Sequence, residues 1–197
     1  MKFLFSKLFV LTSVLMVSVV TYAKQYSDIS LNILGYDNKQ KSILVEENSA
    51  SYEVPKIYAY PLNEIQYDLA KYDQRFDHLS DSILFKQKLS SIQPKLKPLK
   101  AINIDDFKIN LLEQSSSDTD TTSTQHFNKT YTSIFTISNV KYQSTQQNLT
   151  SYTPNIKLKQ AFELPKNKGV LITFESLALP FDQGYTREES VVLFPRQ

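Results

Sequence analysis

The sequence predicts an α+β domain in which a mostly antiparallel sheet packs against one main amphipathic helix. Two observations carry this prediction. Short apolar segments with period-2 alternation, separated by turn residues, recur from residue 29 to residue 194, as in antiparallel sheets. One helical stripe interrupts them between residues 65 and 79.

The first 23 residues have the pattern of a cleaved signal peptide. Lys2 and Lys7 precede an apolar stretch from Leu8 to Val20. Thr21-Tyr22-Ala23 follows, with small residues at the two positions that a signal peptidase recognises. A retained anchor is the weaker alternative, because the apolar stretch is shorter than the ~20 residues that cross a bilayer. We expect cleavage after Ala23, a single domain over residues 24–197, and no transmembrane segment in the mature chain.

Composition limits the partners and the compartment. The chain has no cysteine, which excludes a disulfide framework and the lipidated cysteine of a bacterial lipoprotein. It carries 22 Lys and Arg against 20 Asp and Glu, so removal of Lys2 and Lys7 leaves the mature chain balanced. Nucleic acid is therefore not an expected partner, because phosphate binding needs a basic surplus on one face.

The first strands are predicted just past the cleavage site. Ile29, Leu31 and Ile33 alternate with polar residues, and an apolar run at residues 43–45 follows a turn at residues 35–38. A third strand is expected over residues 52–60, at an edge or with a bulge because Pro55 interrupts it.

The main helix is predicted next. Apolar residues step by 4, 3, 4 and 3, and Asn63 and Gln66 are placed as an N-cap and its reciprocal partner. The stripe consists of Ile65, Leu69, Tyr72, Phe76 and Leu79.

The rest of the chain is expected to be β-rich. A strand begins at Ile83-Leu84-Phe85, a longer run covers residues 102–111 with one change of phase, and residues 114–126 form a flexible polar surface loop within the domain. Later strands are expected over residues 131–142, 156–164 and 170–174, with a turn at 165–169 and a strand at 191–194 that closes the sheet.

No pattern of catalytic, metal-binding or cofactor-binding residues stands out. The two histidines, His78 and His126, are far apart in sequence, and no serine lies in a nucleophile motif. Adjacent carboxylates occur in three pairs, but neighbours on a strand point to opposite faces. We expect no enzyme activity and no cofactor. The three pairs are Glu46-Glu47, Asp105-Asp106 and Glu188-Glu189.

Tyrosines in polar contexts are the remaining candidates for ligand binding. The chain has 12 tyrosines and no tryptophan. A tyrosine ring can stack on a sugar while its hydroxyl makes a hydrogen bond, although aromatic residues also simply fill strand faces. The candidate ligand-binding residues are Tyr142, Tyr152 and Tyr185.

The order of segments resembles the CsiV-type periplasmic peptidoglycan-binding proteins, a family linked with cell shape. The resemblance lies in an opening strand at residues 26–36, a helix followed by a strand at 69–87, a strand around Val140-Lys141-Tyr142, and residues 161–172. The family's His and Trp after the helix are absent, and Leu164-Pro165 replaces Asp-His-Pro. The resemblance therefore implies a shared fold more than a shared site.

Export, charge balance and this resemblance together predict a non-enzymatic periplasmic binding protein that contacts peptidoglycan or a cell-wall synthesis partner. Secretion, or peripheral association with an envelope membrane, is the alternative location. An interaction or assembly protein of an envelope secretion or surface apparatus is the alternative function, and a long exposed edge strand would favour it. A wall hydrolase is the third alternative.

Overall fold

The computed structural model describes residues 28–62, 71–76, 79–118, 129–178 and 185–196. These residues confirm the α+β class, because they form one α-helix and a large mixed sheet whose strands pair antiparallel except for β1 and β12. The expected signal peptide lies outside the described residues. The strands are β1 (Ile29–Asp37), β2 (Ser42–Ser49), β3 (Lys56–Pro61), β4 (Lys71–Tyr72), β5 (Lys100–Ile102), β6 (Lys108–Asp118), β7 (Lys129–Ser138), β8 (Tyr142–Ser144), β9 (Gln147–Ser151), β10 (Lys157–Glu163), β11 (Val170–Ala178) and β12 (Tyr185–Pro195). The α-helix is α2 (Ser82–Ile92), and single 3₁₀ turns cover Gln74–Phe76, Gln93–Lys95, Ile104–Asp106 and Pro165–Asn167.

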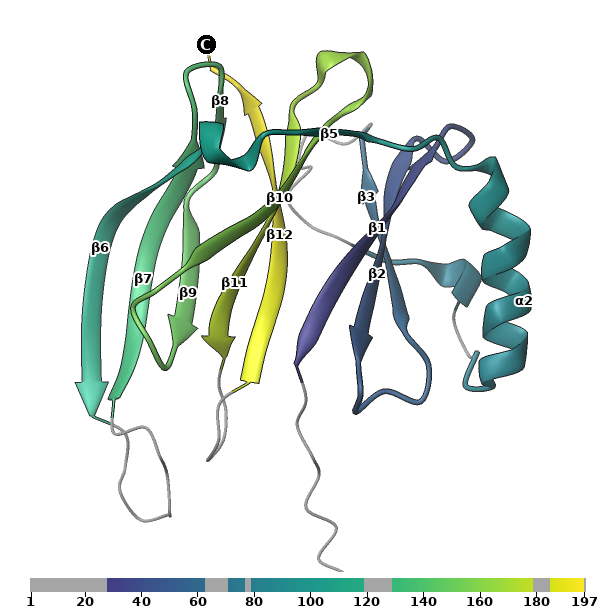
Figure 1. Ribbon diagram of the computed structural model, residues 1–197, viewed down its shortest axis with the longest axis horizontal. Coiled ribbons are helices and arrows are strands. Elements are labelled where there is room, and N and C mark those ends of the chain that lie inside the picture. The colour runs from purple at the N-terminus through teal and green to yellow at the C-terminus, as the bar shows by residue number, and fades with distance from the viewer. Residues whose placement is uncertain (1–27, 63–70, 77–78, 119–128, 179–184, 197) are drawn as a thin grey trace, which may run out of the picture.

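The sheet folds over itself into layers. Figure 1 shows β6, β7 and β9 on one side, then β10, β11 and β12, then β1, β2 and β3, and finally α2. Each of the three gaps between layers is filled by its own apolar cluster, with Phe135, Leu171 and Phe85 as one buried member of each. The core of the molecule is thus three thin layers of side chains rather than one central mass.

Strand β12 lies at the centre of this arrangement. It pairs with β11 from Tyr185 to Leu193, with β8 near its end and with β1 at one point. Val191 and Leu193 belong to the cluster shared with β7, and Val192 belongs to the cluster shared with β1 and β2. Residues 191–194 were expected to close the sheet, but they lie in its middle because both faces of β12 are apolar.

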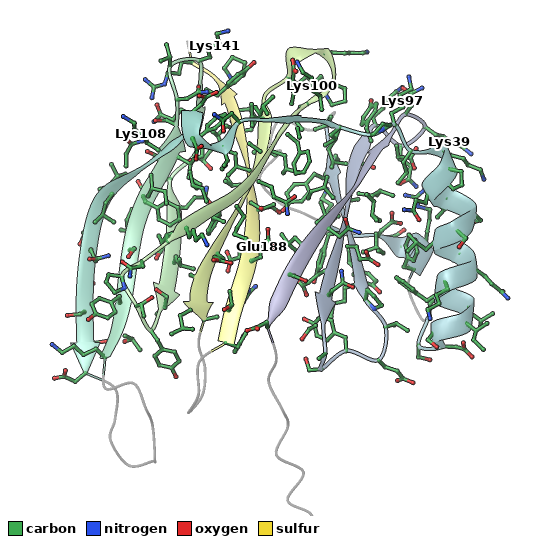
Figure 2. All side chains as sticks on the ribbon, in the orientation of Figure 1. Lys39, Lys97, Lys100, Lys108, Lys141 and Glu188 are labelled. Carbon is green, nitrogen blue, oxygen red and sulfur yellow. The ribbon has the colours of Figure 1, made fainter. Side chains whose placement is uncertain are left out.

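Two side-chain carboxylates accept backbone hydrogen bonds between β1 and β12, which pair with each other at one position only. The only paired positions are Ile29 and Arg187. Asp28 accepts a hydrogen bond from the Thr186 amide at 2.8 Å, and Glu188 accepts one from the Leu31 amide at 3.0 Å. Figure 2 shows Glu188 between the two layers, where it is buried.

The predicted helix over residues 65–79 is wrong over its described part. Within residues 65–79, Lys71-Tyr72 forms β4 and Gln74–Phe76 forms a 3₁₀ turn, while residues 63–70 and 77–78 lie outside the described part of the chain. The helix instead covers Ser82–Ile92, where a strand was expected to begin at residue 83. Its start is fixed by Asp81, whose side chain accepts hydrogen bonds from the amides of Ile83 and Leu84.

The predicted polar loop is wrong over its first five residues. Residues 114–118 continue β6, which pairs with β7 as far as Asp118 opposite Lys129. Every side chain from Leu111 to Asp118 is exposed, so this end of the strand needs no apolar residues. The rest of the expected loop, residues 119–126, lies outside the described residues. No helix in the described part of the chain is long and apolar enough to span a bilayer.

A network centred on Arg75 connects the end of β1 to the 3₁₀ turn after β4. The Arg75 guanidinium contacts Asp37 at 2.8 Å and Asp73 at 2.7 Å. Asp37 also accepts hydrogen bonds from the amides of Lys39 and Gln40, which shapes the β1–β2 turn. Burial works against the charged form of Asp37, but these amides and Arg75 together hold its pKa below the ordinary value.

This network predicts a loss of stability in acid. Because the pKa of Asp37 is lower in the folded state than in the unfolded state, its contribution is complete above the unfolded pKa of about 3.9. That contribution is lost as the pH falls through the folded-state pKa. Urea unfolding measured from about pH 6 to about pH 3 should show a steeper fall for the wild type than for Asp37→Asn. Parallel curves would contradict the assignment.

Candidate functional site

Tyrosines gather on the inner face of the β2–β3 hairpin, towards β12. In the register of this hairpin, Tyr60 lies opposite Ile43, Tyr58 opposite Val45 and Lys56 opposite Glu47. Side chains two residues apart on a strand share a face. Tyr60 and Val45 are part of the buried cluster, whereas Tyr58 and Glu47 continue the same face past its end and are only half-buried.

Tyr52, in the turn of this hairpin, folds back onto that face. Its hydroxyl donates a 2.8 Å hydrogen bond to Glu47. The Lys56 amino group lies 4.1 Å from the centre of the Tyr52 ring and 3.9 Å from the Glu47 carboxylate. The three side chains therefore fix one another, with the aromatic ring held between an amine and a carboxylate.

Two further tyrosines extend this surface. The Tyr72 ring of β4 meets the Tyr58 ring edge to face, with centres 6.0 Å apart, and is 40% exposed. Tyr185, at the start of β12, is half-buried and, like Arg187 two residues later, lies near enough to the Tyr52 hydroxyl to affect its pKa. We call Tyr52, Tyr58, Tyr72 and Tyr185 the tyrosine surface.

The hydroxyls of Tyr52 and Tyr58 stay protonated at neutral pH. Burial, followed by the hydrogen bond to Glu47 and its charge, raises the pKa of Tyr52 to about 12. Burial, with a smaller effect of Glu47, also raises the pKa of Tyr58. Burial raises the pKa of Tyr60 more than its hydrogen bond with Ser190 lowers it. Neutral hydroxyls beside partly exposed rings suit stacking and hydrogen bonding.

The structure separates the three tyrosines that the sequence proposed. Tyr142 begins β8 at the opposite end of the sheet, where it pairs with Pro195 and packs on the core. Tyr152 is 5% exposed, and its amide donates to the Leu177 carbonyl, so its ring is covered. Tyr185 alone joins the tyrosine surface. Sequence reasoning missed Tyr52, Tyr58 and Tyr72.

The described residues contain no group of three or more His, Cys, Asp or Glu side chains arranged to hold a metal ion. Both histidines, His78 and His126, lie outside those residues. The adjacent carboxylates Glu188 and Glu189 differ in environment, since Glu188 is buried against β1 and Glu189 contacts Arg187 at 3.2 Å. No protein-family model, no curated protein and no solved structure matches the chain.

Proposed function

We propose that the chain is a non-enzymatic binding protein of the bacterial periplasm that contacts peptidoglycan or a partner in cell-wall synthesis. The observation that carries the proposal is the tyrosine surface, where three strands and a turn present partly exposed rings and where the hydroxyls of Tyr52 and Tyr58 are held in the protonated form. The signal-peptide pattern and the resemblance to the CsiV-type family support the location and the ligand.

The chemistry of the surface suits the cell wall. Peptidoglycan combines sugar rings, which offer flat C–H faces to aromatic side chains, with short peptides that carry free carboxylates. The tyrosine rings would take the sugars, and the cations beside them, Lys56 and Arg187, would take the carboxylates. Both cations already contact acidic side chains, so a wall carboxylate would share or exchange these contacts.

Sedimentation of residues 24–197 with purified sacculi tests this function. We expect saturable binding that survives moderate salt, and about five- to ten-fold weaker binding by Tyr72→Ala, since one aromatic contact contributes about 1 kcal/mol. Tyr131→Ala is the matched control, because Tyr131 lies on β7, in the layer farthest from the hairpin.

Equal weakening by the two alanine variants would argue against the tyrosine surface as the site. Absence of binding by the wild type, combined with failure to recover any envelope protein after cross-linking in cells, would overturn the proposed function. Release of soluble muropeptides would replace it with a wall hydrolase.

Strand β6 favours a second candidate, an interaction protein of an envelope apparatus. Within the described residues, β6 is hydrogen-bonded only to β7, so one side of an 11-residue strand faces outward. Leu111 and Leu112 in its middle are 52% and 58% exposed. Such an edge can accept a strand from another chain. Cross-links from β6 to one envelope protein, without binding to sacculi, would favour this function.

A further inference from the structure

The charges of the described residues are separated between the two ends of the sheet. The turns and strand ends at one end carry a large basic surplus, and those at the other end carry an acidic surplus. The basic end has Lys39, Lys41, Lys95, Lys97, Lys100, Lys108, Lys141, Lys166, Lys168 and Arg196 against Asp37, Asp105, Asp106 and Glu163. The acidic end has Asp28, Glu47, Glu53, Asp81, Asp118, Glu175 and Glu189 against Lys56, Lys129, Lys157, Lys159 and Arg187. A chain with almost no net charge therefore still has one end that is clearly basic.

Five exposed lysines form what we call the basic edge. Figure 2 shows them along one edge of the molecule, from Lys39 in the β1–β2 turn to Lys108 at the start of β6. Of these five lysines, only Lys100 makes an ion pair with a described residue, at 3.3 Å from Glu163, and its side chain is still 77% exposed. The basic edge consists of Lys39, Lys97, Lys100, Lys108 and Lys141.

A shallow open groove lies within the basic edge. Lys97 and Lys100 come from the segment that leads into β5, and Lys166 comes from the β10–β11 turn. Tyr36 and Leu164, both buried, also line the groove. Two of the five lysines of the basic edge therefore border this groove, together with Glu163, which pairs with Lys100.

An exposed apolar residue stands at the same end of the molecule. Val140 is 92% exposed, next to Lys141 in the β7–β8 turn. The turn is rigid, since the Asn139 side chain accepts hydrogen bonds of 2.8 Å from the amides of Lys141 and Tyr142. Residues that insert into a membrane interface often combine an outward-pointing apolar side chain with a neighbouring lysine, as Val140 and Lys141 do.

We infer that the basic edge docks the protein on the surface of a membrane that contains anionic phospholipids. The lysines come from separate segments and lie along one edge of the molecule, so an extended anionic surface can contact several of them together, whereas one small anion reaches only the groove. Each lysine near such a surface contributes to binding. This site lies apart from the tyrosine surface and does not rest on the proposed function.

Vesicle flotation tests the basic edge. The full mature chain should bind vesicles of phosphatidylcholine with about 30% phosphatidylglycerol, should not bind pure phosphatidylcholine, and should dissociate as salt is raised. Replacing Lys97, Lys100 and Lys141 by glutamine should weaken binding about 100-fold, at about five-fold per lysine. The matched control carries Lys86→Gln, Lys88→Gln and Lys129→Gln, which remove the same charge from α2 and from the start of β7.

A tryptophan reporter tests the contact itself. Because the chain has no tryptophan, Val140→Trp introduces a single one. Its emission should shift to the blue with the anionic vesicles, whereas Leu84→Trp, at a 52% exposed position on α2, should not respond. Equal binding of both vesicle types, equal losses in the two triple variants, or no shift at residue 140 would overturn the inference. Binding to soluble polyphosphate but not to vesicles would assign the edge to a polyanion instead.

Discussion

Arg75→Met should lower the free energy of unfolding by about 3 kcal/mol. The guanidinium is the shared partner of Asp37 and Asp73, which are 8% and 4% exposed. Its removal leaves two buried carboxylates facing each other without a cation, and breaking a buried pair costs about 3–5 kcal/mol. The lower end of that range applies because the Arg75 side chain is 23% exposed and water can partly replace it.

Urea unfolding followed by circular dichroism measures this loss. Arg75→Lys should fall between the wild type and Arg75→Met, because an ammonium keeps the charge but cannot donate to both carboxylates in the same fork geometry. The triple variant Asp37→Asn, Asp73→Asn, Arg75→Met should recover part of the stability, since no charge is then buried. A change below about 1 kcal/mol for Arg75→Met would show that the network contributes little.

Gly169→Ala should destabilise the protein by at least about 3 kcal/mol. Gly169 has a φ of +149°, a conformation that costs other residues about 1–3 kcal/mol. A Cβ atom there would lie 2.1 Å from the Leu193 carbonyl oxygen, which is backbone of the central strand β12. The methyl group fits only if β11 and β12 separate at their first pair, Val170 and Leu193.

Thermal or urea unfolding checks this effect, and the same turn offers a control. Lys166 has a φ of +62°, where glycine is better tolerated than lysine, so Lys166→Gly should leave stability unchanged or raise it by up to about 1 kcal/mol. Loss of stability in both variants would show that stability depends on the conformation of the β10–β11 turn rather than on the contact between Gly169 and β12.

The strands were predictable where one or both faces are apolar. Alternation at Ile29, Leu31 and Ile33 and the run at residues 43–45 correctly located β1 and β2, and Pro55 directly precedes β3. The end of β6 was missed, because an exposed edge strand can consist of Ser, Gln and Asp as long as its backbone pairs with β7. From its composition alone, such a segment is predicted to be a loop.

The helix was misplaced because two segments have apolar residues at helical spacing. Phe85, Leu89 and Ile92 step by 4 and 3 and pack towards β2 and β3, but three adjacent apolar residues at 83–85 also resemble a buried strand. The capping side chain of Asp81 was the signal that distinguishes them. In the other segment, Tyr72 pairs with Tyr58 in the sheet, which overrides the local pattern.

The candidate site was less predictable than the fold. Tyr185 was identified from its polar surroundings, but Tyr52, Tyr58 and Tyr72 come from a turn and two strands that only the hairpin register brings together. The basic edge could not be predicted from the sequence for the same reason. Charge balance over the whole sequence says nothing about how turns far apart in the chain gather the lysines at one end.

The central position of β12 has a consequence for the order in which the protein can assemble. Ribosomes make the chain from its N-terminus, so β12 is the last of the described strands to emerge. This strand supplies Val191, Val192 and Leu193 to two apolar clusters. Neither cluster can be completed while residues 185–195 are still to be added. For a chain that we propose to cross a membrane, this delay prolongs the time during which the nascent protein remains unfolded and competent for translocation.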